Sequence, residues 1–546
     1  MTCFRTHGAT PCKTILGTTR GLAQTRRLFH RNEDGSLVLF SLFTLIILIL
    51  LAGIGVDVAR HEALRTQLQN TLDRAVLAAA NLDNTLDPKD VVEDYFAKAG
   101  LLEYLTEVKT EISGQGRRVT AYVAADIPTY FMKFAAIDEL SLSSSGAAEQ
   151  GLANLEISLV LDVSNSMNNS RRLTNLSNAG QAFAQTIFDN SAPDAVSFSV
   201  IPYSTQVNAG ATILSELKLN DPHNYSHCIN FSADDFYDPS LETKDIPFAK
   251  TYDQTVSFDP FYNGYYNSGA VLEVCDPKAV NAILPFSRSL SDVKQKIRSL
   301  VADGNTSIDL GVKWGAALLH PSARPLTQAL INSGEVDVAM LGHPADDTGG
   351  TLKVLVVMTD GVNTTQYTMP ESYRSGPSDM FLAPDGRVSF PTVYQVCGYR
   401  GWYYTCRDET RWYEPNRGRY YEDVYGGSNA VRLSWPEVWR RFTLASHANA
   451  RRAASGSYND YNFWMNSTLA GIENDAKDAR LNTICSAAKA NNILVFTVGF
   501  EVPYSAHSVL RNCASSPAHY YDVEGLEITD AFAAIATKVT ELRLVE

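Results

Sequence analysis

An uncharged, strongly apolar run over residues 36–56 constrains this chain more than any other feature of its sequence. At about 1.5 Å per residue, a helix of this length crosses the roughly 30 Å of hydrocarbon in a bilayer. A cleaved secretory signal is the alternative interpretation. However, the run is longer than a typical signal core, and no clean small-x-small cleavage site follows it before Asp57 and Arg60. The sequence therefore predicts a retained anchor that spans the membrane once.

The residues before this run predict its orientation. Residues 1–34 form a basic tail with few acidic residues, and its basic side chains are Arg5, Lys13, Arg20, Arg26, Arg27 and Arg31. Positively charged flanks stay on the cytoplasmic side of a membrane. We therefore expect the N-terminus to lie in the cytoplasm and the chain after Asp57 to lie outside it.

The apolar run continues into an amphipathic helix over residues 57–82, whose apolar stripe is Leu64, Leu68, Leu72, Val76 and Ala79. Three segments, residues 34–36, 56–60 and 75–80, carry a family resemblance. Over residues 30–82 the chain resembles the N-terminal segment of TadG-like proteins of bacterial tight-adherence (Flp) pilus assembly. The resemblance implies a protein of the bacterial inner membrane, with its bulk periplasmic or extracellular. We take residues 35–87 as the anchor and its helical extension.

Residues 88–150 are predicted to form a small α+β module. A helix over residues 90–99 precedes alternating strands over 105–112 and 118–125, joined by a turn at residues 114–116. A short helix (130–136) and a strand (140–144) follow. No chemistry is visible in this module, so a spacer or packing role is expected.

The remaining chain, residues 151–546, begins with the apolar run of a strand buried on both faces of a parallel sheet, residues 155–161. The run ends in Asp162, Ser164 and Ser166, spaced two residues apart. Ligand sites in open α/β sheets lie outside the carboxyl ends of the strands, and a carboxylate with two hydroxyls suits a hard cation such as Mg²⁺. Taken alone, Asp and Ser after a strand more often cap the next helix.

Two later segments fit the same pattern. Thr306 lies in a glycine-containing loop that runs into a helix, and Asp360 ends a second buried strand, residues 352–359. With Asp162, Ser164 and Ser166, these positions resemble the metal-ion-dependent adhesion site of a von Willebrand factor type A domain. The resemblance implies a doubly wound, Rossmann-like α/β fold and one bound Mg²⁺, or Mn²⁺ or Ca²⁺. It also implies that a carboxylate from a partner protein completes the metal coordination.

Two segments are long additions to a minimal domain of this kind, at about residues 211–284 and 363–467. The second is rich in aromatic residues: Tyr394, Tyr399, Trp402, Tyr403, Tyr404, Trp412, Tyr413, Tyr420, Tyr421 and Tyr425. Exposed Tyr, Trp and Arg are enriched at binding hot spots. Alternatively, these aromatics fill a small core within the addition, and the sequence does not decide between the two.

Six of the eight cysteines follow the predicted span, an even number on the potentially oxidising side. Six cysteines allow fifteen pairings. Because each pair lies within one addition or one terminal subdomain, we hypothesise the disulfides Cys228–Cys275, Cys397–Cys406 and Cys485–Cys513.

Composition limits the function further. A net charge of −14 argues against nucleic-acid binding, which needs basic surfaces. None of the G-x-S-x-G, H-E-x-x-H or Walker-type motifs is present in the sequence. The predicted site offers carboxylates and hydroxyls without a nearby histidine, whereas a hydrolytic metal site usually supplies its own base.

The leading hypothesis is therefore not an enzyme. It is a membrane-anchored, metal-dependent protein-binding component of an Flp/Tad pilus assembly or adhesion apparatus, whose partner is a pilus or envelope protein offering an Asp or Glu. One alternative is a surface adhesin that binds host or matrix ligands directly. The other is an envelope hydrolase whose nucleophile lies in one of the additions.

Overall fold

The computed structural model describes residues 34–81, 84, 86–113, 116–151, 154–192, 194–260, 273–275, 278–346 and 350–545. The predicted basic tail, apart from residue 34, and most of the turn at 114–116 lie outside these residues. The chain divides into two compact units, Met1–Ile112 with Arg117–Gln150, and Ser113–Gly116 with Gly151–Glu546.

The first unit is built on one long helix, α2 (Asp34–Ala80). Within the described residues, α2 alone is long and apolar enough to cross a membrane. Nearly all of its large apolar side chains between Leu37 and Leu51 are exposed, which is compatible with a segment that faces lipid. The helix predicted from the apolar run and the following stripe is therefore present as one continuous element.

The rest of the first unit packs on the second half of α2. It comprises α3 (Pro88–Lys98) and a three-stranded sheet of β1 (Leu105–Ser113), β2 (Gly116–Pro128) and β3 (Glu139–Gly151), with the short 3-10 helix η2 (Met132–Ala135) before β3. The stripe residues Leu68, Leu72 and Val76 share one core with Phe96 and Val123. The buried Asp57 carboxylate also accepts hydrogen bonds from the backbone N–H groups of Tyr130, Phe131 and Met132. The helical extension and the small module thus form a single packed body.

The second unit is organised around a six-stranded sheet with the order β19-β18-β10-β4-β5-β9. Five strands are parallel: β4 (Asn154–Asp162), β5 (Val196–Tyr203), β10 (Thr351–Thr359), β18 (Ile493–Phe500) and β19 (Tyr520–Val523). The edge strand β9 (Leu284–Ser287) runs antiparallel to β5. The sequence did not predict β9, because it is short and follows the first long addition directly.

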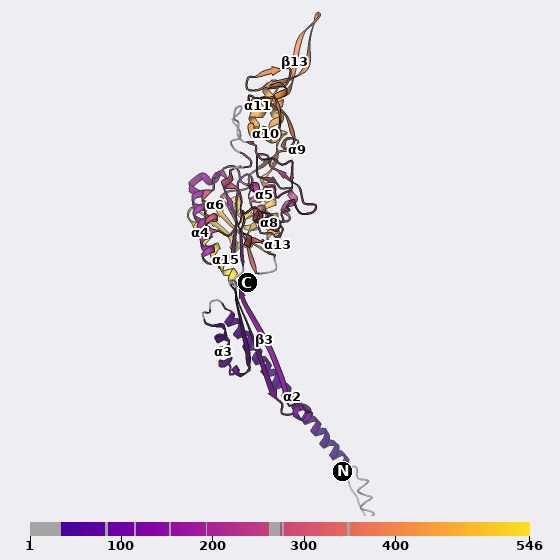
Figure 1. The fold of residues 1–546 in the computed structure, drawn as a ribbon, viewed down its shortest axis with the longest axis vertical. Coiled ribbons are helices and arrows are strands. Elements are labelled where there is room, and N and C mark those ends of the chain that lie inside the picture. Colours follow the sequence, from indigo (N-terminus) through magenta and orange to yellow (C-terminus); the bar gives the residue numbers. More distant parts are fainter. Residues whose placement is uncertain are drawn as a thin grey trace, which may run out of the picture. The chain divides into compact units, whose positions relative to one another are not determined.

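Helices cover both faces of this sheet (Figure 1). On one face, α4 (Arg172–Asp189), α6 (Leu290–Ser299) and α15 (Glu527–Val545) pack on side chains such as Leu159 and Val356. On the other face, α7 (Ile308–Ala317), α8 (Arg324–Asn332) and α13 (Asn474–Ala490) pack on Val160 and Leu355. Adjacent strand residues point to opposite faces, so the uninterrupted apolar strands supply both cores. The predicted α/β class is confirmed.

Two glycines bring α7 close to the sheet. A Cβ atom at Gly311 would lie 2.7 Å from the Tyr203 ring, and one at Gly315 would lie 2.6 Å from Val160. A larger residue at either position would push the helix away from the strands, together with the loop that carries Thr306.

The long segments after β5 and β10 contribute to a further core of their own. Val256, Phe258 and Val274 from the first share this core with residues of the second, among them Phe390 and Trp439. Its sheet has the order β15-β14-β13-β12-β16 and consists of β12 (Pro377–Leu382), β13 (Val388–Arg400), β14 (Tyr403–Glu414), β15 (Arg419–Tyr421) and β16 (Val431–Ser434). The helices α10 (Trp435–Arg441), α11 (Leu444–Ser455) and α12 (Tyr458–Asn466) also contribute to this core.

The aromatic residues of the second addition include both exposed side chains and side chains that fill a core. Tyr413 is buried in this core, whereas Tyr399, Trp402, Tyr403 and Tyr404 are exposed. The three hypothesised disulfides, Cys228–Cys275, Cys397–Cys406 and Cys485–Cys513, are all present.

Candidate metal and partner-binding site

The predicted site lies where two neighbouring parallel strands end. Asp162 is the last residue of β4, and Asp360 directly follows β10, which pairs with β4. After Asp162 the chain turns into the 3-10 helix η3 (Asn165–Arg171) and then α4. The loop from α6 to α7 brings Thr306 to the same edge of the sheet.

Asp162 is fully buried, and three donors hold its carboxylate. Oδ1 accepts from the Ser164 backbone N–H at 2.8 Å, and Oδ2 accepts from Thr359 Oγ1 at 2.7 Å and from the Tyr203 hydroxyl at 3.3 Å. Burial, together with the nearby Asp360 carboxylate, raises the pKa of Asp162 to about 6. The site therefore concentrates negative charge in a place that is poorly solvated, which favours a bound cation.

Three of the predicted oxygens lie in direct contact. Ser166 Oγ donates to Asp360 Oδ1 at 2.6 Å, and the Ser164 and Ser166 hydroxyl oxygens are 3.0 Å apart. Octahedral Mg²⁺ has bonds of about 2.0–2.1 Å, so neighbouring ligand oxygens lie about 2.9 Å apart. The two serine hydroxyls already have the spacing of two adjacent ligands.

Thr306 approaches the same place from a third segment. A Cβ atom at Gly361, next to Asp360, would lie 3.9 Å from Thr306 Oγ1. The Thr306 backbone is fixed, because its N–H donates to Thr364 Oγ1 at 3.0 Å and its carbonyl accepts from Lys477 Nζ at 2.9 Å. In the described part of the chain, no hydrogen bond joins the Thr306 hydroxyl to the other four predicted residues.

Lys477 on α13 supports this loop from below the surface. Its fully buried ammonium donates to the carbonyls of Thr306 and Thr364 and to the Ser307 hydroxyl, and lies 3.8 Å from Asp309. Burial lowers the pKa of Lys477 to about 8, although Asp309 opposes the shift. Lys477 therefore ties together the loops that follow α6 and β10, which carry Thr306 and Asp360.

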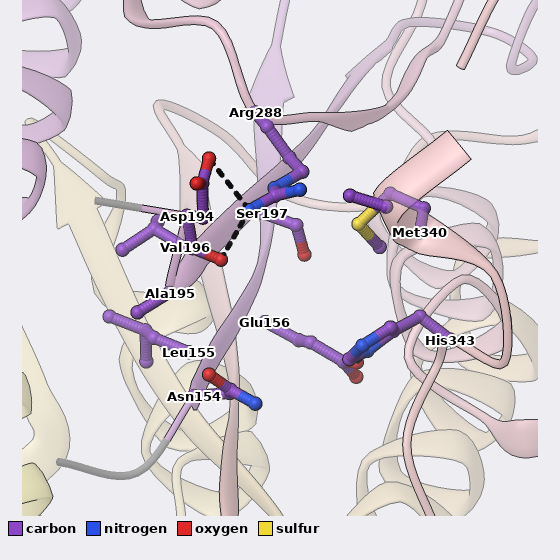
Figure 2. A pocket seen from close by; sticks show the side chains of 11 residues that line it. Asn154, Leu155, Glu156, Asp194, Ala195, Val196, Ser197, Arg288, Met340 and His343 are labelled. Carbon is purple, nitrogen blue, oxygen red and sulfur yellow. Dashed lines mark hydrogen bonds and ion pairs between the residues drawn. The ribbon is translucent and has the colours of Figure 1, made fainter. Parts of the chain in front are cut away.

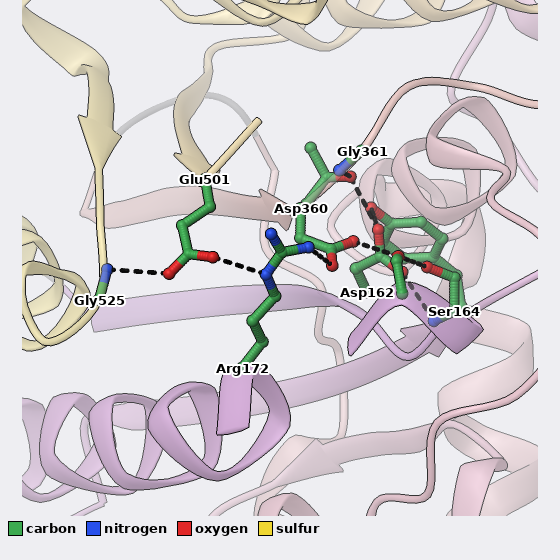
Figure 3. Close-up of polar contacts among 10 residues, drawn as sticks. Asp162, Ser164, Arg172, Asp360, Gly361, Glu501 and Gly525 are labelled. Atoms are coloured by element: carbon green, nitrogen blue, oxygen red, sulfur yellow. Dashed lines mark hydrogen bonds and ion pairs between the residues drawn. The ribbon is translucent and has the colours of Figure 1, made fainter. Parts of the chain in front are cut away.

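Arg172, which the sequence did not indicate as a site residue, contacts the site directly (Figure 3). Its Nη1 donates to Asp360 Oδ2 at 2.8 Å and its Nε to Glu501 Oε2 at 2.7 Å. Glu501 Oε1 in turn accepts from the Gly525 backbone N–H at 3.1 Å. Arg172 follows the Asp-x-Ser-x-Ser motif closely, but nothing in its spacing indicates a pair with Glu501, because Glu501 lies 329 residues further along the chain.

The residues present fit a hard divalent cation. They offer two carboxylates and three hydroxyls, which are the oxygen ligands that Mg²⁺ prefers. Both oxygens of Asp360 are engaged, one by Ser166 and one by Arg172, and both oxygens of Asp162 accept hydrogen bonds. Ser166 uses its proton in the bond to Asp360, so the lone pairs of its hydroxyl oxygen remain available to bind a cation directly.

A pocket of about 240 Å³ lies at the opposite, amino-terminal end of β4 and β5 (Figure 2). There the buried Glu156 accepts from His343 Nδ1 at 2.6 Å, and Arg288 pairs with Asp194. None of the five predicted site residues lines this pocket, so we keep it separate from the site.

Fold and site together define a protein with an N-terminal apolar helix and a mixed α/β unit that carries an oxygen-rich cluster at its strand ends. Residues 35–82 match the family model described as putative Flp pilus-assembly TadE/G-like. This match confirms the resemblance predicted for the N-terminal segment and associates that segment with pilus assembly. A comparison with curated protein sequences found no match.

The solved structures to which the chain is similar include several proteins of bacterial pili. The vWF domain of the type V pili tip protein Mfa5 from Porphyromonas gingivalis is 12% identical, with 72% of this chain and 96% of that chain covered and a TM-score of 0.31. The tip pilin GBS104 from Group B Streptococcus agalactiae is 14% identical, with 70% and 99% covered and a TM-score of 0.29. The pilus adhesin RrgA from Streptococcus pneumoniae is 12% identical, with 79% and 50% covered and a TM-score of 0.30.

Proposed function

We propose that this protein is a membrane-anchored, metal-dependent protein-binding component of an Flp/Tad pilus assembly or adhesion apparatus. Its second unit would be a doubly wound, von Willebrand factor type A-like domain with two long additions. The parallel order of β18, β10, β4 and β5, with helices on both faces, supports this assignment. The family match of residues 35–82 supports the role in pilus assembly.

The observation that carries the proposal is the convergence of the five predicted residues at one edge of the sheet. Three segments far apart in sequence supply them, and the contacts from Ser164 through Ser166 to Asp360 connect two of these segments. Helix capping alone would not require Asp360 or Thr306 at this place. A shared cation would explain why oxygens from separate segments meet at this place.

We assign Ser164 and Ser166 as direct metal ligands and Thr306 as a direct or water-bridged one. Asp162 and Asp360 would act mostly through water, as their occupied oxygens suggest. Mg²⁺ is the preferred ion, with Mn²⁺ or Ca²⁺ as alternatives. When bound, the ion would supply an open coordination position for an Asp or Glu of the partner, which is a binding function and not an enzymatic one.

The apolar half of α2 would anchor the protein in the bacterial inner membrane, with the basic tail in the cytoplasm and both folded units outside. The three disulfides are compatible with this topology, because disulfides persist in oxidising compartments.

Photocrosslinking in cells tests the proposal directly. A photoreactive amino acid replaces Asn165, which is exposed and lies between the two site serines. We expect it to capture a pilus or envelope protein in the parent chain and to lose that product in Asp162→Asn or after chelation. Asp234→Asn, at an exposed aspartate away from the site, is the matched control. Capture that persists in Asp162→Asn would contradict the proposal, and capture of only a host or matrix ligand would favour the adhesin.

A further inference from the structure

The strands β13 and β14 form a long hairpin (Figure 1). The residues at its tip are aromatic and are not part of the proposed metal site. The two strands pair continuously from Phe390 opposite Tyr413 to Arg400 opposite Tyr403. At its base, Phe390 and Tyr413 are buried in the surrounding core. Beyond Val393 almost every residue of both strands is exposed.

A disulfide and a tight turn restrict the backbone conformation of the tip. The Cys397–Cys406 disulfide joins residues that lie directly opposite each other. Gly401 has a φ of +68°, a conformation that glycine adopts without strain, and with Trp402 it forms the two-residue turn. A free two-stranded ribbon is marginal in water, so the disulfide and the buried base are what fix the tip.

Four large aromatic side chains surround this tip. Trp402 is 97% exposed, Tyr399 and Tyr403 are each 78% exposed, and Tyr404 is 62% exposed. Tyr399 and Tyr404 lie opposite each other on one face of the ribbon, their ring centroids 5.2 Å apart. Tyr403 pairs with Arg400 on the other face, since side chains alternate along a strand, and Trp402 is at the end.

Because the aromatic side chains lie on both faces and at the end of the ribbon, only an environment that surrounds the tip would bury all of them. A flat protein surface covers one face of a ribbon and leaves the aromatics on the other face in water. A bilayer interface surrounds an inserted tip on all sides. Tyr and Trp are also the residues enriched at that interface, because their rings have an apolar body and a polar end.

The charge of the tip agrees with a lipid surface. Residues 397–407 contain Arg400 and Arg407 and no acidic residue, whereas the whole chain has a net charge of −14. Arg407 pairs with Glu409, so Arg400 is the outermost basic group. Anionic headgroups would attract this end of the molecule and repel most of the rest of it.

We propose that residues 399–404 form a second membrane-binding element, which inserts into the interface of a bilayer that contains anionic lipid. The tip has four aromatic side chains for the interfacial layer and Arg400 for a lipid phosphate. This binding is independent of the metal site and of the bilayer crossing by α2.

A flotation experiment with the full chain tests this inference. The chain is held through α2 in nanodiscs of phosphatidylcholine and mixed with vesicles of phosphatidylcholine and phosphatidylglycerol. We expect the loaded nanodiscs to float with these vesicles, and empty nanodiscs not to. Trp402→Ser with Tyr403→Ser should weaken flotation about ten-fold or more, because two aromatic side chains no longer enter the interface. Arg400→Gln should weaken it about five-fold, and only with anionic vesicles.

The matched control is Tyr504→Ser on α14 (Tyr504–Cys513), since Tyr504 is 92% exposed and lies outside the hairpin. Vesicles with brominated lipid chains give a second readout, because they should quench tryptophan fluorescence in the parent chain but not in Trp402→Phe. Flotation no stronger than that of empty nanodiscs, or unchanged in the tip variants, would overturn the inference. Pairing of loaded nanodiscs without vesicles, lost in the tip variants, would also overturn it, because the tip would then bind a second copy of the chain.

Discussion

At the scale of single residues, Arg172 determines how much positive charge the site holds without a metal. Its guanidinium bridges Asp360 and Glu501 and so offsets part of the repulsion between Asp162 and Asp360. A divalent cation would bind beside this fixed positive charge. We therefore expect Arg172 to stabilise the metal-free site and to oppose binding of the proposed metal.

Replacing Arg172 tests this double role. In Arg172→Gln, we expect Mg²⁺ to bind roughly ten-fold more tightly, because a like charge near the ion is gone. We also expect the metal-free protein to lose about 1–3 kcal/mol, because two charge-assisted hydrogen bonds are lost. Calorimetric titration and melts in chelator measure the two effects. Weaker metal binding in the variant would mean instead that Arg172 orients Asp360 for the metal.

Lys313 on α7 gives the protein a pH dependence that can be measured. Its buried ammonium donates to the carbonyls of Asp238 and Ser240 at 2.6 and 2.9 Å. Burial lowers the pKa of Lys313 from 10.5 to about 8, although Asp235 and Asp238 oppose the shift. Between these two values the unfolded chain keeps a proton that the folded chain has lost, so stability should rise with pH across this window.

The substitution Lys313→Met removes this proton from both states. The free energy of unfolding of the parent chain minus that of the variant should rise with pH from about 8 towards 10.5. The rise should approach about 1.4 kcal/mol for each pH unit. Urea denaturation at several pH values within the window checks the slope. Parallel pH profiles for the two chains would contradict the assigned shift.

At the scale of elements, a disulfide that closes a longer loop should stabilise the protein more than one that closes a shorter loop. The sequence separations are 47 residues for Cys228–Cys275 and 9 for Cys397–Cys406. In the chain-entropy account, removing them costs roughly 4 and roughly 3 kcal/mol, respectively. Denaturation of Cys→Ser pairs tests the order, and non-reducing peptide mapping tests the pairings. Free thiols at Cys485 and Cys513 would contradict the third bridge.

Elements marked by a continuous pattern in the sequence could be predicted. Features that depend on contacts between residues far apart in the sequence could not. The strands predicted over residues 155–161 and 352–359 lie within β4 and β10, because each is a mostly apolar run that ends at a carboxylate or a turn. The exposed hairpin of β13 and β14 was not predicted as such, since its aromatics are equally typical of a core. In the site, the Asp-x-Ser-x-Ser motif indicated three residues at once, whereas Glu501 and Lys477 reach the site only through the folded chain.

At the scale of the whole molecule, the proposed topology predicts where a fused reporter enzyme is active. A reporter enzyme that is active only in the periplasm should be active when fused after Gln150, because the basic tail precedes the apolar half of α2. The matched fusion after residue 33 should be inactive. Activity of a reporter that works only in the cytoplasm, fused after Gln150, would reverse the assigned orientation.

A calorimetric Mg²⁺ titration, paired with thermal melts in chelator and in Mg²⁺, tests the proposed metal site. If the metal binds only the folded state, Mg²⁺ at a hundred times its Kd should stabilise the protein by roughly 2.7 kcal/mol. Ser166→Ala, at a half-buried serine, should lose most of this shift, whereas Ser191→Ala, at another half-buried serine, should keep it. No heat of binding, together with identical melts in chelator and Mg²⁺ for the parent chain, would contradict the proposed metal site.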